Sequence, residues 1–549
     1  MKLNYKNTIK VGFAFAIIML FWQAYDFVVP LLLDNIYGLP DDIRGLIMGL
    51  DNLLSLFLLP LFGNLSDRHN SKRGKRTPFI IMGTIASVVL LIFVPLCANM
   101  QKGDAYNLRQ ELSSKIDSVK LAEFYDNAKS GDNTKYCDYE YLNRSGISRD
   151  TYINLKLIDI SEEKSGDTVK YYKTTDGVKV EIQKTEYDEL IDTNAKYKRY
   201  AQAGINTYLS DEVYNQITKK NLTSLILYMI VLFFVLVAMA TFRSPAVALM
   251  PDVTPKPLRS QANAIINLAG GFGAALAFII YTVWLEVNET AYLEIFITVG
   301  IGMLVLLITF LRLVNEPQLA EQCRLISEEY GIREEEEEQE AVKTKMEKDK
   351  KASFLLILGS IFMWFMGYNA VTSNLSLYAT RNLLYAPSMA GIITAISMGV
   401  SALAFIPVGY LAVKIGRKKS IIIGFALATV SFFLIFLFVR PDWTKILFAV
   451  FYLIAGFGLI IANVNTFPMV VELSKEGDVG KYTGFYYTAT MSAQAITPYI
   501  AGLFMKIKPE YLFIYSTVCV IVAIVLMSFV KHGDSKPVPP ESKLEMMSD

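Results

Sequence analysis

Long apolar runs restrict this sequence more than any other feature. Twelve such runs lie along the chain, each close to the length of about 20 residues that a helix needs to cross the hydrocarbon core of a bilayer. A helix satisfies all of its backbone hydrogen-bonding groups internally, which makes it the simplest structure for a segment surrounded by lipid. The 549 residues are 53% hydrophobic and carry a formal net charge of only +1, as expected for a chain whose solvent is mostly lipid. We therefore predict an all-α membrane protein with twelve transmembrane helices.

The apolar runs form two groups of six. The first group comprises residues 9–33, 43–63, 79–98, 222–241, 262–284 and 292–313. The second group comprises residues 354–378, 388–413, 420–439, 443–470, 482–505 and 511–530. The first run has no small-residue cleavage site and leads into further spans, so we interpret it as a permanent helix and not as a signal peptide.

The basic residues of the short loops predict the orientation. The loop 64–78 after the second span and the loop 414–419 after the eighth are rich in Lys and Arg, whereas the loops 34–42 and 285–291 are acidic. Short loops rich in Lys and Arg stay on the cytoplasmic side of a membrane. We therefore expect a multi-pass protein of the cell membrane with both termini in the cytoplasm.

A polar stretch, residues 100–220, separates the third span from the fourth on the predicted outer side. Within it, residues 168–182 predict a strand, an Asp-Gly turn and a second strand, while 107–129 and 185–203 have helical character. The sequence therefore predicts a small α+β extracytoplasmic insertion between helices 3 and 4.

A second polar stretch joins the two groups of spans and carries an acidic run at 334–338, typical of a charged, solvated linker. The predicted domains are accordingly the N-terminal half (1–99 and 221–314), the insertion (100–220), the cytoplasmic linker (315–352), the C-terminal half (353–531) and a cytoplasmic tail (532–549).

The two groups of spans resemble copies of one unit. The segment GNLSDRHNSKRGKRTPFIIMG at 63–83 corresponds to GYLAVKIGRKKSIIIG at 409–424, since each is a glycine, a helix end, a basic turn and a new helix. These copies start 346 residues apart (409 minus 63), whereas Asp252 and Glu472 in a second pair of similar segments lie 220 apart (472 minus 252). The difference of 126 is close to the length of the insertion, so a duplicated six-helix unit with one insertion explains both spacings. Secondary transporters commonly have such repeats around a central site.

The loop 63–76 resembles the signature loop of the major facilitator superfamily, and the segment 242–264 is similar to one branch of it. That branch comprises the sucrose/proton symporters and the neighbouring glycoside-pentoside-hexuronide/cation symporters, and the residues that carry the likeness in the loop are Ser66, Asp67, Arg68, Ser71, Gly74, Arg76, Pro78 and Phe79. The likeness covers nearly all twelve spans but not the insertion. It implies alternating access, a disaccharide or related glycoside as the solute, and a proton as the coupling ion. The partners that we expect are such a small-molecule solute, a proton or Na+, and the lipid bilayer, and we expect a monomer.

A set of charged residues beside the basic loops suggests a cytoplasmic gate. Charge pairs at a mouth between two halves can form in one state and break in the other, which shifts a two-state equilibrium without contact to the solute. The gate candidates are Asp67, Arg68, Arg76, Arg243, Asp252 and Glu472. The alternative is that the basic residues only fix the topology.

Two carboxylates lie well inside apolar runs of the N-terminal half, Asp26 in FWQAYDFVVP and Asp51 in MGLDNLLSLF. A charge near the middle of a bilayer costs at least about 2.5 kcal/mol, so it usually faces a partner or a wet cavity. A proton-coupled carrier requires a carboxylate that takes up a proton on one side and releases it on the other. Asp26 and Asp51 are therefore our proton-coupling candidates. The alternative for each is a structural hydrogen bond to a neighbouring helix.

Aromatic and amide side chains in the spans predict a polar central cavity. Sugars are bound by aromatic faces and by a few groups that orient their hydroxyls. The substrate-binding candidates are Trp22, Gln23, Tyr25, Asn52, Asn267, Trp364, Tyr368, Asn369 and Gln494. Any single one of them could instead serve as a hydrogen bond between helices.

Several classes of function find no support in the sequence. Four scattered cysteines lack the spacing of a metal or redox site, so we expect no metal and no cofactor. A phosphate-binding Gly-rich loop and a nucleophile with a base are both missing, which argues against an enzyme. The balanced charge argues against nucleic acid. Two alternatives remain beside a symporter: a facilitator or exporter of another small polar or amphipathic solute, and a membrane sensor that uses the insertion.

Overall fold

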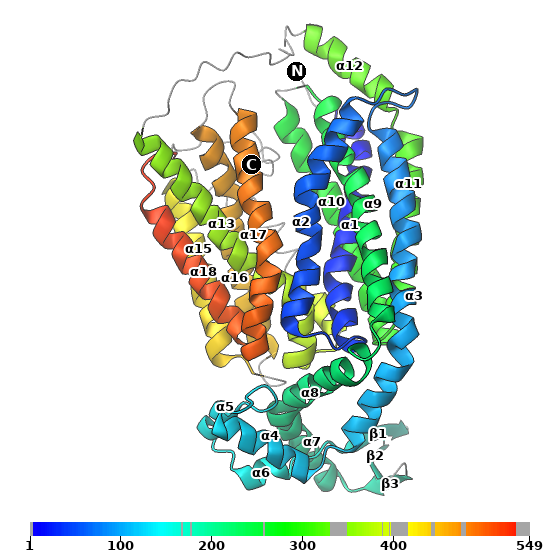
Figure 1. Ribbon diagram of the computed structural model, residues 1–549, viewed down its shortest axis with the longest axis vertical. Helices are drawn as coiled ribbons and strands as arrows, with labels where there is room; N and C mark the ends of the chain where they lie inside the picture. Colours follow the sequence, from blue (N-terminus) through cyan, green and yellow to red (C-terminus); the bar gives the residue numbers. More distant parts are fainter. Residues whose placement is uncertain are drawn as a thin grey trace.

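The structure is a computed structural model that describes residues 4–165, 168–175, 178–255, 258–329, 348–386, 388–394, 396, 415–440, 445–473 and 479–533. Two bundles of long helices stand side by side, and a smaller domain covers one end of both (Figure 1). We call the end that carries this domain the insertion end. The opposite end, where Figure 1 marks the N-terminus, is the linker end.

The N-terminal bundle holds six long helices. They are α1 (Tyr5–Asn35), α2 (Asp41–Asp67), α3 (Thr77–Ser114), α9 (Thr223–Asp252), α10 (Arg259–Val287) and α11 (Tyr292–Leu313). Helix α1 is apolar on all sides and packs closely on α10, because Gly12 lies against Ala269 and Gly273 lies against the backbone of Ala16. A helix that is hydrophobic all round belongs in the interior, and most of α1 is buried.

The C-terminal bundle begins with α13 (Lys348–Leu377), which continues into the π-helical turn η4 (Tyr378–Asn382). It is completed by α15 (Arg417–Phe438), α16 (Lys445–Glu472), α17 (Val479–Ile507) and α18 (Tyr511–Ser528). Gly424 and Gly458 lie against each other's backbone, so α15 and α16 approach closely. The predicted span 388–413 lies largely outside the described residues.

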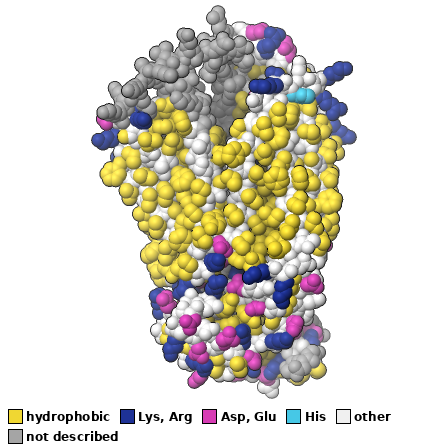
Figure 2. Space-filling view, in the orientation of Figure 1, with side chains coloured by type: hydrophobic (Ala, Val, Ile, Leu, Met, Phe, Trp, Pro, Cys, Tyr) yellow, Lys and Arg dark blue, Asp and Glu magenta, His cyan; other side chains and the backbone are white. Residues whose placement is uncertain are grey.

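These helices confirm the predicted membrane fold. Ten helices among the described residues are long and apolar enough to cross a bilayer, and α17 lies at the predicted eleventh span. The outer surface of the bundles is covered by hydrophobic side chains between the two ends, whereas charged residues gather at the insertion end (Figure 2). Large side chains such as Phe57, Phe272 and Val305 are more than half exposed on this surface, as expected for residues that face lipid and not water.

The insertion is a small folded domain with its own core. It contains α4 (Ser118–Ser130), α5 (Tyr139–Arg144), α6 (Arg149–Ile153), β1 (Asp159–Ser165), β2 (Thr168–Thr175) and β3 (Val178–Ile182). The strands form one antiparallel sheet in the order β1-β2-β3. A helical rod follows, made of α7 (Lys184–Tyr197), η1 (Lys198–Gln202), α8 (Ala203–Val213) and η2 (Tyr214–Thr218). Leu121, Phe124 and Tyr152 are buried in the core of this domain.

Two helices extend the N-terminal bundle beyond the predicted spans. Helix α3 continues without a break past residue 98 to Ser114, and thereby carries the chain from the bundle into the insertion. At the linker end, the short helix α12 (Glu316–Glu329) lies across the bundle (Figure 1). The predicted linker is therefore helical at its start, and its acidic run lies outside the described residues.

The two bundles touch at the insertion end. Gly45 of α2 lies against the backbone of Pro498 in α17, Gly49 lies against Ala495, and Gly502 lies against Asp41. A Cβ atom on any of these three glycines would overlap the opposite backbone. In the space-filling view the bundles part toward the linker end (Figure 2).

Candidate functional site

Three charged side chains of the N-terminal bundle form an electrostatically coupled group. Asp26 of α1 interacts with Asp51 of α2 and with Arg243 of α9, and Arg243 interacts with both carboxylates. The guanidinium carbon of Arg243 lies 5.3 Å from the centroid of the Trp22 ring. When both carboxylates are ionised, the group carries one negative charge in excess.

The surroundings of the two carboxylates differ. Asp51 is 8% exposed and accepts a hydrogen bond of 2.9 Å from the side-chain amide of Asn52. Asp26 is exposed, although its neighbours on α1 are buried. A carboxylate inside an apolar bundle is stable only beside water or a partner, and Arg243 is such a partner for Asp26.

The C-terminal bundle contributes Tyr368 of α13 to this region. Tyr368 is 38% exposed and lies close enough to Asp26 for the two to interact electrostatically. Helices α1 and α13 pack against each other. Asp26 of the N-terminal bundle and Tyr368 of the C-terminal bundle therefore lie at one place where the two bundles meet.

The other predicted substrate residues divide into three groups. Trp22, Gln23, Asn52, Asn369 and Gln494 are partly exposed, so they are available to line an opening. The Asn369 amide donates 2.8 Å to the Phe365 carbonyl of its own helix, which leaves its side-chain oxygen for other partners.

Tyr25 and Trp364 are only 1% and 2% exposed and pack against other aromatic rings, Tyr25 on Trp22 and Trp364 on Tyr368. They support the lining residues from behind. The side chain of Asn267 lies outside the described part of the structure.

Sequence reasoning missed two tyrosines near Tyr368. Tyr452 of α16 interacts electrostatically with Tyr368 and with Tyr281 of α10, and Tyr281 stacks on Phe27 with ring centroids 4.2 Å apart. Nothing in the sequence distinguishes these tyrosines from others in apolar runs. Only the packing of α10, α13 and α16 assembles them.

The predicted gate residues form two separate clusters at the linker end. Arg76 pairs with Asp67, and its Nε lies 2.7 Å from Asp252 Oδ2. Burial lowers the pKa of Arg76, but its hydrogen bonds and charge pairs with Asp252 and Asp67 outweigh burial and raise the pKa above its usual value. In the other bundle, Glu472 Oε2 lies 2.8 Å from Arg417 Nη1.

Neither of these ion-pair clusters connects the bundles, within the part of the chain that the structure describes. Arg68 is exposed and forms no side-chain contact in the Arg76 cluster. Arg243 lies with Asp26 and Asp51 instead of with Arg76, because α9 continues for nine residues beyond it to Asp252, a rise of about 14 Å.

Helix α12 holds the start of α3 through one carboxylate. Glu316 accepts hydrogen bonds from the backbone amides of Lys75, Arg76 and Thr77 at 2.6, 2.9 and 2.7 Å. These are the unsatisfied donors at a helix N-terminus, which favours a negative charge. Gly74, with a φ of +102°, lies so close to this carboxylate that a Cβ would overlap it.

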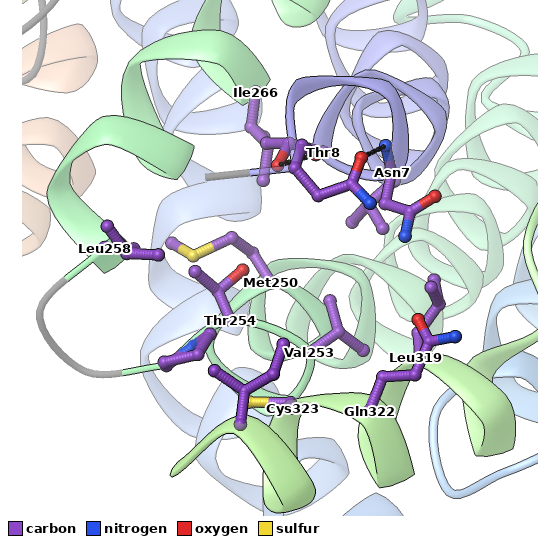
Figure 3. A pocket seen from close by; sticks show the side chains of 14 residues that line it. Asn7, Thr8, Met250, Val253, Thr254, Leu258, Ile266, Leu319, Gln322 and Cys323 are labelled. Atoms are coloured by element: carbon purple, nitrogen blue, oxygen red, sulfur yellow. Dashed lines mark hydrogen bonds between the residues drawn. The ribbon is translucent and has the colours of Figure 1, made fainter. Parts of the chain in front are cut away.

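A small cavity of about 80 Å³ lies beside α12 (Figure 3). Side chains from α1, α9, α10 and α12 surround it, among them Thr8, Met250, Leu258 and Gln322. Ligand pockets for small molecules usually have at least about 300 Å³. This cavity is therefore too small for a disaccharide and can hold only a few water molecules.

A buried ionic cluster connects the bundles at the insertion end. Arg381 of η4 lies 3.1 Å from Asp34 Oδ1 and 3.3 Å from Asp41 Oδ1. Arg44 lies 3.6 Å from Asp34 and 2.5 Å from Asp41. The side chains of all four residues are at most 9% exposed. The sequence showed an acidic loop at 34–42, but not the arginine that the other bundle brings to it.

Sequence comparisons identify relatives of the chain. Residues 220–384 and 357–546, together more than half of the chain, match the sequence model of the Major Facilitator Superfamily, and residues 11–106 match that of an MFS/sugar transport protein. An uncharacterised MFS-type transporter of Methanocaldococcus jannaschii is 30% identical over 125 residues. This match spans 23% of the chain and only 30% of that relative's length.

Solved structures share the fold at low sequence identity. A bacterial homologue of the iron transporter ferroportin, in an inward-facing state, has a TM-score of 0.53 and 15% identity over 97% of this chain and all of its own. The inward-open xylose transporter XylE from E. coli has a TM-score of 0.53 and 14% identity over 96% of each chain. A D-xylose-proton symporter has a TM-score of 0.51 and 14% identity over 96% of this chain and 99% of its own. At such identities the likeness shows the fold alone.

Proposed function

Because the chain belongs to the major facilitator superfamily and is thus a membrane transporter, we propose that it carries a disaccharide or related glycoside in symport with protons. The observation that carries this proposal is the group of Asp26, Asp51 and Arg243, together with Tyr368 from the other bundle. Ionisable groups inside a membrane are rare and usually functional, so a group of two carboxylates and one arginine is the strongest candidate for the coupling site.

The charge balance of this group explains how a proton would be coupled to transport. With both carboxylates ionised, the site has an excess charge, and its transfer into the closed, water-poor intermediate is unfavourable. One proton on Asp26 leaves Asp51 balanced by Arg243, so the loaded site passes through that intermediate more easily. Asp26 is the better proton carrier of the two because it is exposed, whereas Asp51 is buried and bonded to Asn52.

Aromatic and amide side chains of both bundles favour a sugar as the solute. Trp22, Tyr368 and Tyr452 offer aromatic faces for its C–H surfaces, and Gln23 and Gln494 offer amides for its hydroxyls. The match of residues 11–106 to the sequence model of an MFS/sugar transport protein supports the same class of solute.

We also propose how the protein is oriented in the membrane and which conformational state the structure represents. The basic loop 64–78 at the linker end favours a cytoplasmic position for that end and for both termini, in the cell membrane. Contacts between the bundles at the insertion end and their separation toward the linker end then correspond to an inward-facing state. We expect the transporter to act as a monomer.

The test is uptake of radiolabelled sugars into proteoliposomes, with a panel of disaccharides and pentoses. Each sugar is measured with an inward proton gradient, with an inward Na+ gradient and without a gradient, for the wild type, Asp26→Asn and Asp51→Asn. We expect accumulation that needs the proton gradient. Asp26→Asn should lose this accumulation and keep gradient-free exchange of labelled for unlabelled sugar.

The other outcomes separate the alternatives. Accumulation that needs the Na+ gradient and not the proton gradient would show that Na+ is the coupling ion. Equal uptake with and without gradients would favour a facilitator, and no uptake of any sugar would contradict the proposed solute class. Unchanged accumulation by Asp26→Asn would remove the proposed role of Asp26.

A further inference from the structure

The insertion is bound firmly to the N-terminal bundle. Arg109 of α3 donates 2.9 Å to the Ser210 hydroxyl of α8 and 3.0 Å to the Asp34 carbonyl. Gln101 donates 3.0 Å to the Ile36 carbonyl and 2.5 Å to the Thr218 hydroxyl of η2. These bonds are partly or fully buried, and the insertion is also covalently continuous with α3 and α9 of this bundle.

The loop between α1 and α2 fits tightly under the same rod. Gly38 adopts a φ of +59°, which favours glycine, and a Cβ there would overlap the Ser210 carbonyl and lie 2.9 Å from the Tyr214 nitrogen. The Thr218 hydroxyl also donates 2.8 Å to the Tyr37 carbonyl. The insertion and the N-terminal bundle therefore behave as one body at this end.

The same domain also contacts the C-terminal bundle, through side chains that are in part exposed. Lys508, between α17 and α18, lies 3.5 Å from Asp138 and 3.3 Å from Glu140 of the insertion. The guanidinium carbon of Arg440, at the end of α15, lies 4.8 Å from the centroid of the Tyr141 ring. The side chains of Glu140 and Asp138 are 70% and 36% exposed and that of Lys508 is 16% exposed. These ion pairs border water, so they cost less to break than fully buried ones.

The rod also covers the seam between the bundles. Thr207 and Asp211 of α8 line a small hollow together with Asp41 from the N-terminal bundle and Arg381 and Lys506 from the C-terminal bundle. Asp211 interacts electrostatically with Arg381. Helix α8 therefore lies directly over the buried cluster that closes this end.

We propose that the insertion is a latch that holds the insertion end closed, moving with the N-terminal bundle and releasing Lys508 and Arg440 when that end opens. The asymmetry of the contacts assigns the interface that breaks. The side toward the N-terminal bundle is covalently continuous and bonded through backbone carbonyls, whereas the side toward the C-terminal bundle includes the partly exposed ion pairs of Lys508 and the contact of Arg440 with the Tyr141 ring. This inference rests on the alternating access of the proposed function, but not on the solute.

A charge swap tests the latch without any solute. The reporter is a cysteine introduced by Met48→Cys, since Met48 is 5% exposed on the part of α2 that packs against α17. In the protein that carries this reporter, the four native cysteines are replaced, namely Cys97, Cys137, Cys323 and Cys519. The rate of labelling by a membrane-impermeant maleimide, added from the insertion side, measures how often that end opens.

We expect Lys508→Glu to raise this labelling rate by about fivefold, since an exposed pair contributes up to about that factor and a like charge opposes closure further. The double change Asp138→Lys with Lys508→Glu restores opposite charges and should return the rate toward that of the parent. Lys115→Glu is the matched control, because Lys115 pairs with Glu111 within the insertion and is well exposed. An unchanged rate in Lys508→Glu, or no recovery in the swap, would overturn the latch.

A cross-link keeps the test decisive if Lys508→Glu does not fold. Cysteines introduced by Glu140→Cys and Lys508→Cys can be joined by a short, reducible bifunctional reagent. Joining them should abolish labelling of the reporter and net transport, and reduction should restore both. Labelling that continues while the link is intact would refute the latch, whereas loss of labelling in a protein that transports no sugar would leave the latch standing and refute the proposed solute.

Discussion

At the scale of single residues, Arg243 determines the properties of the central site. It is the cation that balances Asp26 and Asp51, and its ring partner Trp22 belongs to the same helix as Asp26. A fixed positive charge beside a carboxylate favours the ionised form, so it helps the site to release its proton. Arg243 therefore belongs to the coupling step in our proposal and not to the gate in which the sequence grouped it.

We expect Arg243→Gln to reduce accumulation at neutral pH while keeping exchange. Without the cation, the carboxylates hold a proton more tightly, and release into the cytoplasm becomes slow at neutral pH. The loss of a nearby opposite charge changes proton affinity by about one pH unit or more, so the optimum of gradient-driven uptake should move to higher pH by about that amount. The measurement is the initial rate of uptake into proteoliposomes across a series of internal pH values.

Arg243→Lys is the control for this prediction, because it keeps the charge and alters only the shape. It should retain most of the accumulation. A Gln variant that accumulates sugar with the wild-type pH dependence would show that the charge of Arg243 has no part in coupling.

The sequence predicted part of this site for a clear physical reason. Asp26 and Asp51 interrupt apolar runs, and an ionisable group in such a run is visible in the sequence alone. Arg243 was visible too, but its partners depend on how far α9 continues before it ends. Tyr281 and Tyr452 carry no charge and fit an apolar run, so only the packing of distant helices identifies them.

At the scale of helices, the contact between α2 and α17 depends on the absence of side chains. Gly45 and Gly49 bring α2 directly onto the backbone of α17 at Pro498 and Ala495. Overpacking such a contact usually costs about 1 to 3 kcal/mol. Because this contact exists between the two bundles, the cost falls on the state that is closed at the insertion end.

Gly45→Ala should therefore shift the protein toward the state that is open at the insertion end by about tenfold. The labelling rate of a cysteine introduced by Met48→Cys measures this shift. Gly271→Ala in α10 is the matched control, since a Cβ at Gly271 meets nothing within 4 Å. Equal labelling rates for the Gly45 and Gly271 variants would show that the glycines of α2 do not set the equilibrium.

Helix positions followed from hydropathy more reliably than helix ends. The long apolar runs predict the positions of α1, α2, α9 and α11 correctly, because a run of about 20 apolar residues in lipid can satisfy its backbone hydrogen bonds only as a helix or in a closed barrel. Helix α3 ends sixteen residues beyond its predicted span (114 minus 98) because a helix that leaves the membrane can continue in water. Strand β1 was missed, since its sequence DISEEKS is polar and lacks the alternation of apolar residues that indicates a strand.

At the scale of the whole molecule, the ionic clusters at the two ends have different roles in this state. At the linker end, Arg76 and Arg417 form ion pairs inside their own bundles. Those ion pairs stabilise each bundle without opposing their separation. At the insertion end, Arg381 is the residue through which one bundle pairs with Asp34 and Asp41 of the other, so opening there must separate buried charges.

Arg381→Met should therefore open the insertion end. Removing one partner of a buried ionic cluster costs about 3 kcal/mol or more, because the remaining charges stay buried without compensation. Here Asp34 and Asp41 would lose the cation that the C-terminal bundle supplies in the closed state, whereas water can solvate both carboxylates once the bundles part. We expect the ratio of open to closed molecules at this end to rise by about a hundredfold, measured from the distance between spin labels placed on exposed positions of α4 and α18.

The matched control is Arg417→Met, which removes an ion pair within the C-terminal bundle at the linker end. It should lower the thermal stability of the protein in detergent and leave the spin-label distances unchanged. If Arg381→Met kept the wild-type distances, or if Arg417→Met changed them equally, closure of the insertion end would not depend on the buried cluster. The glycine contact of α2 with α17, the ion pair between Lys506 and Asp42 and the latch would then hold that end closed.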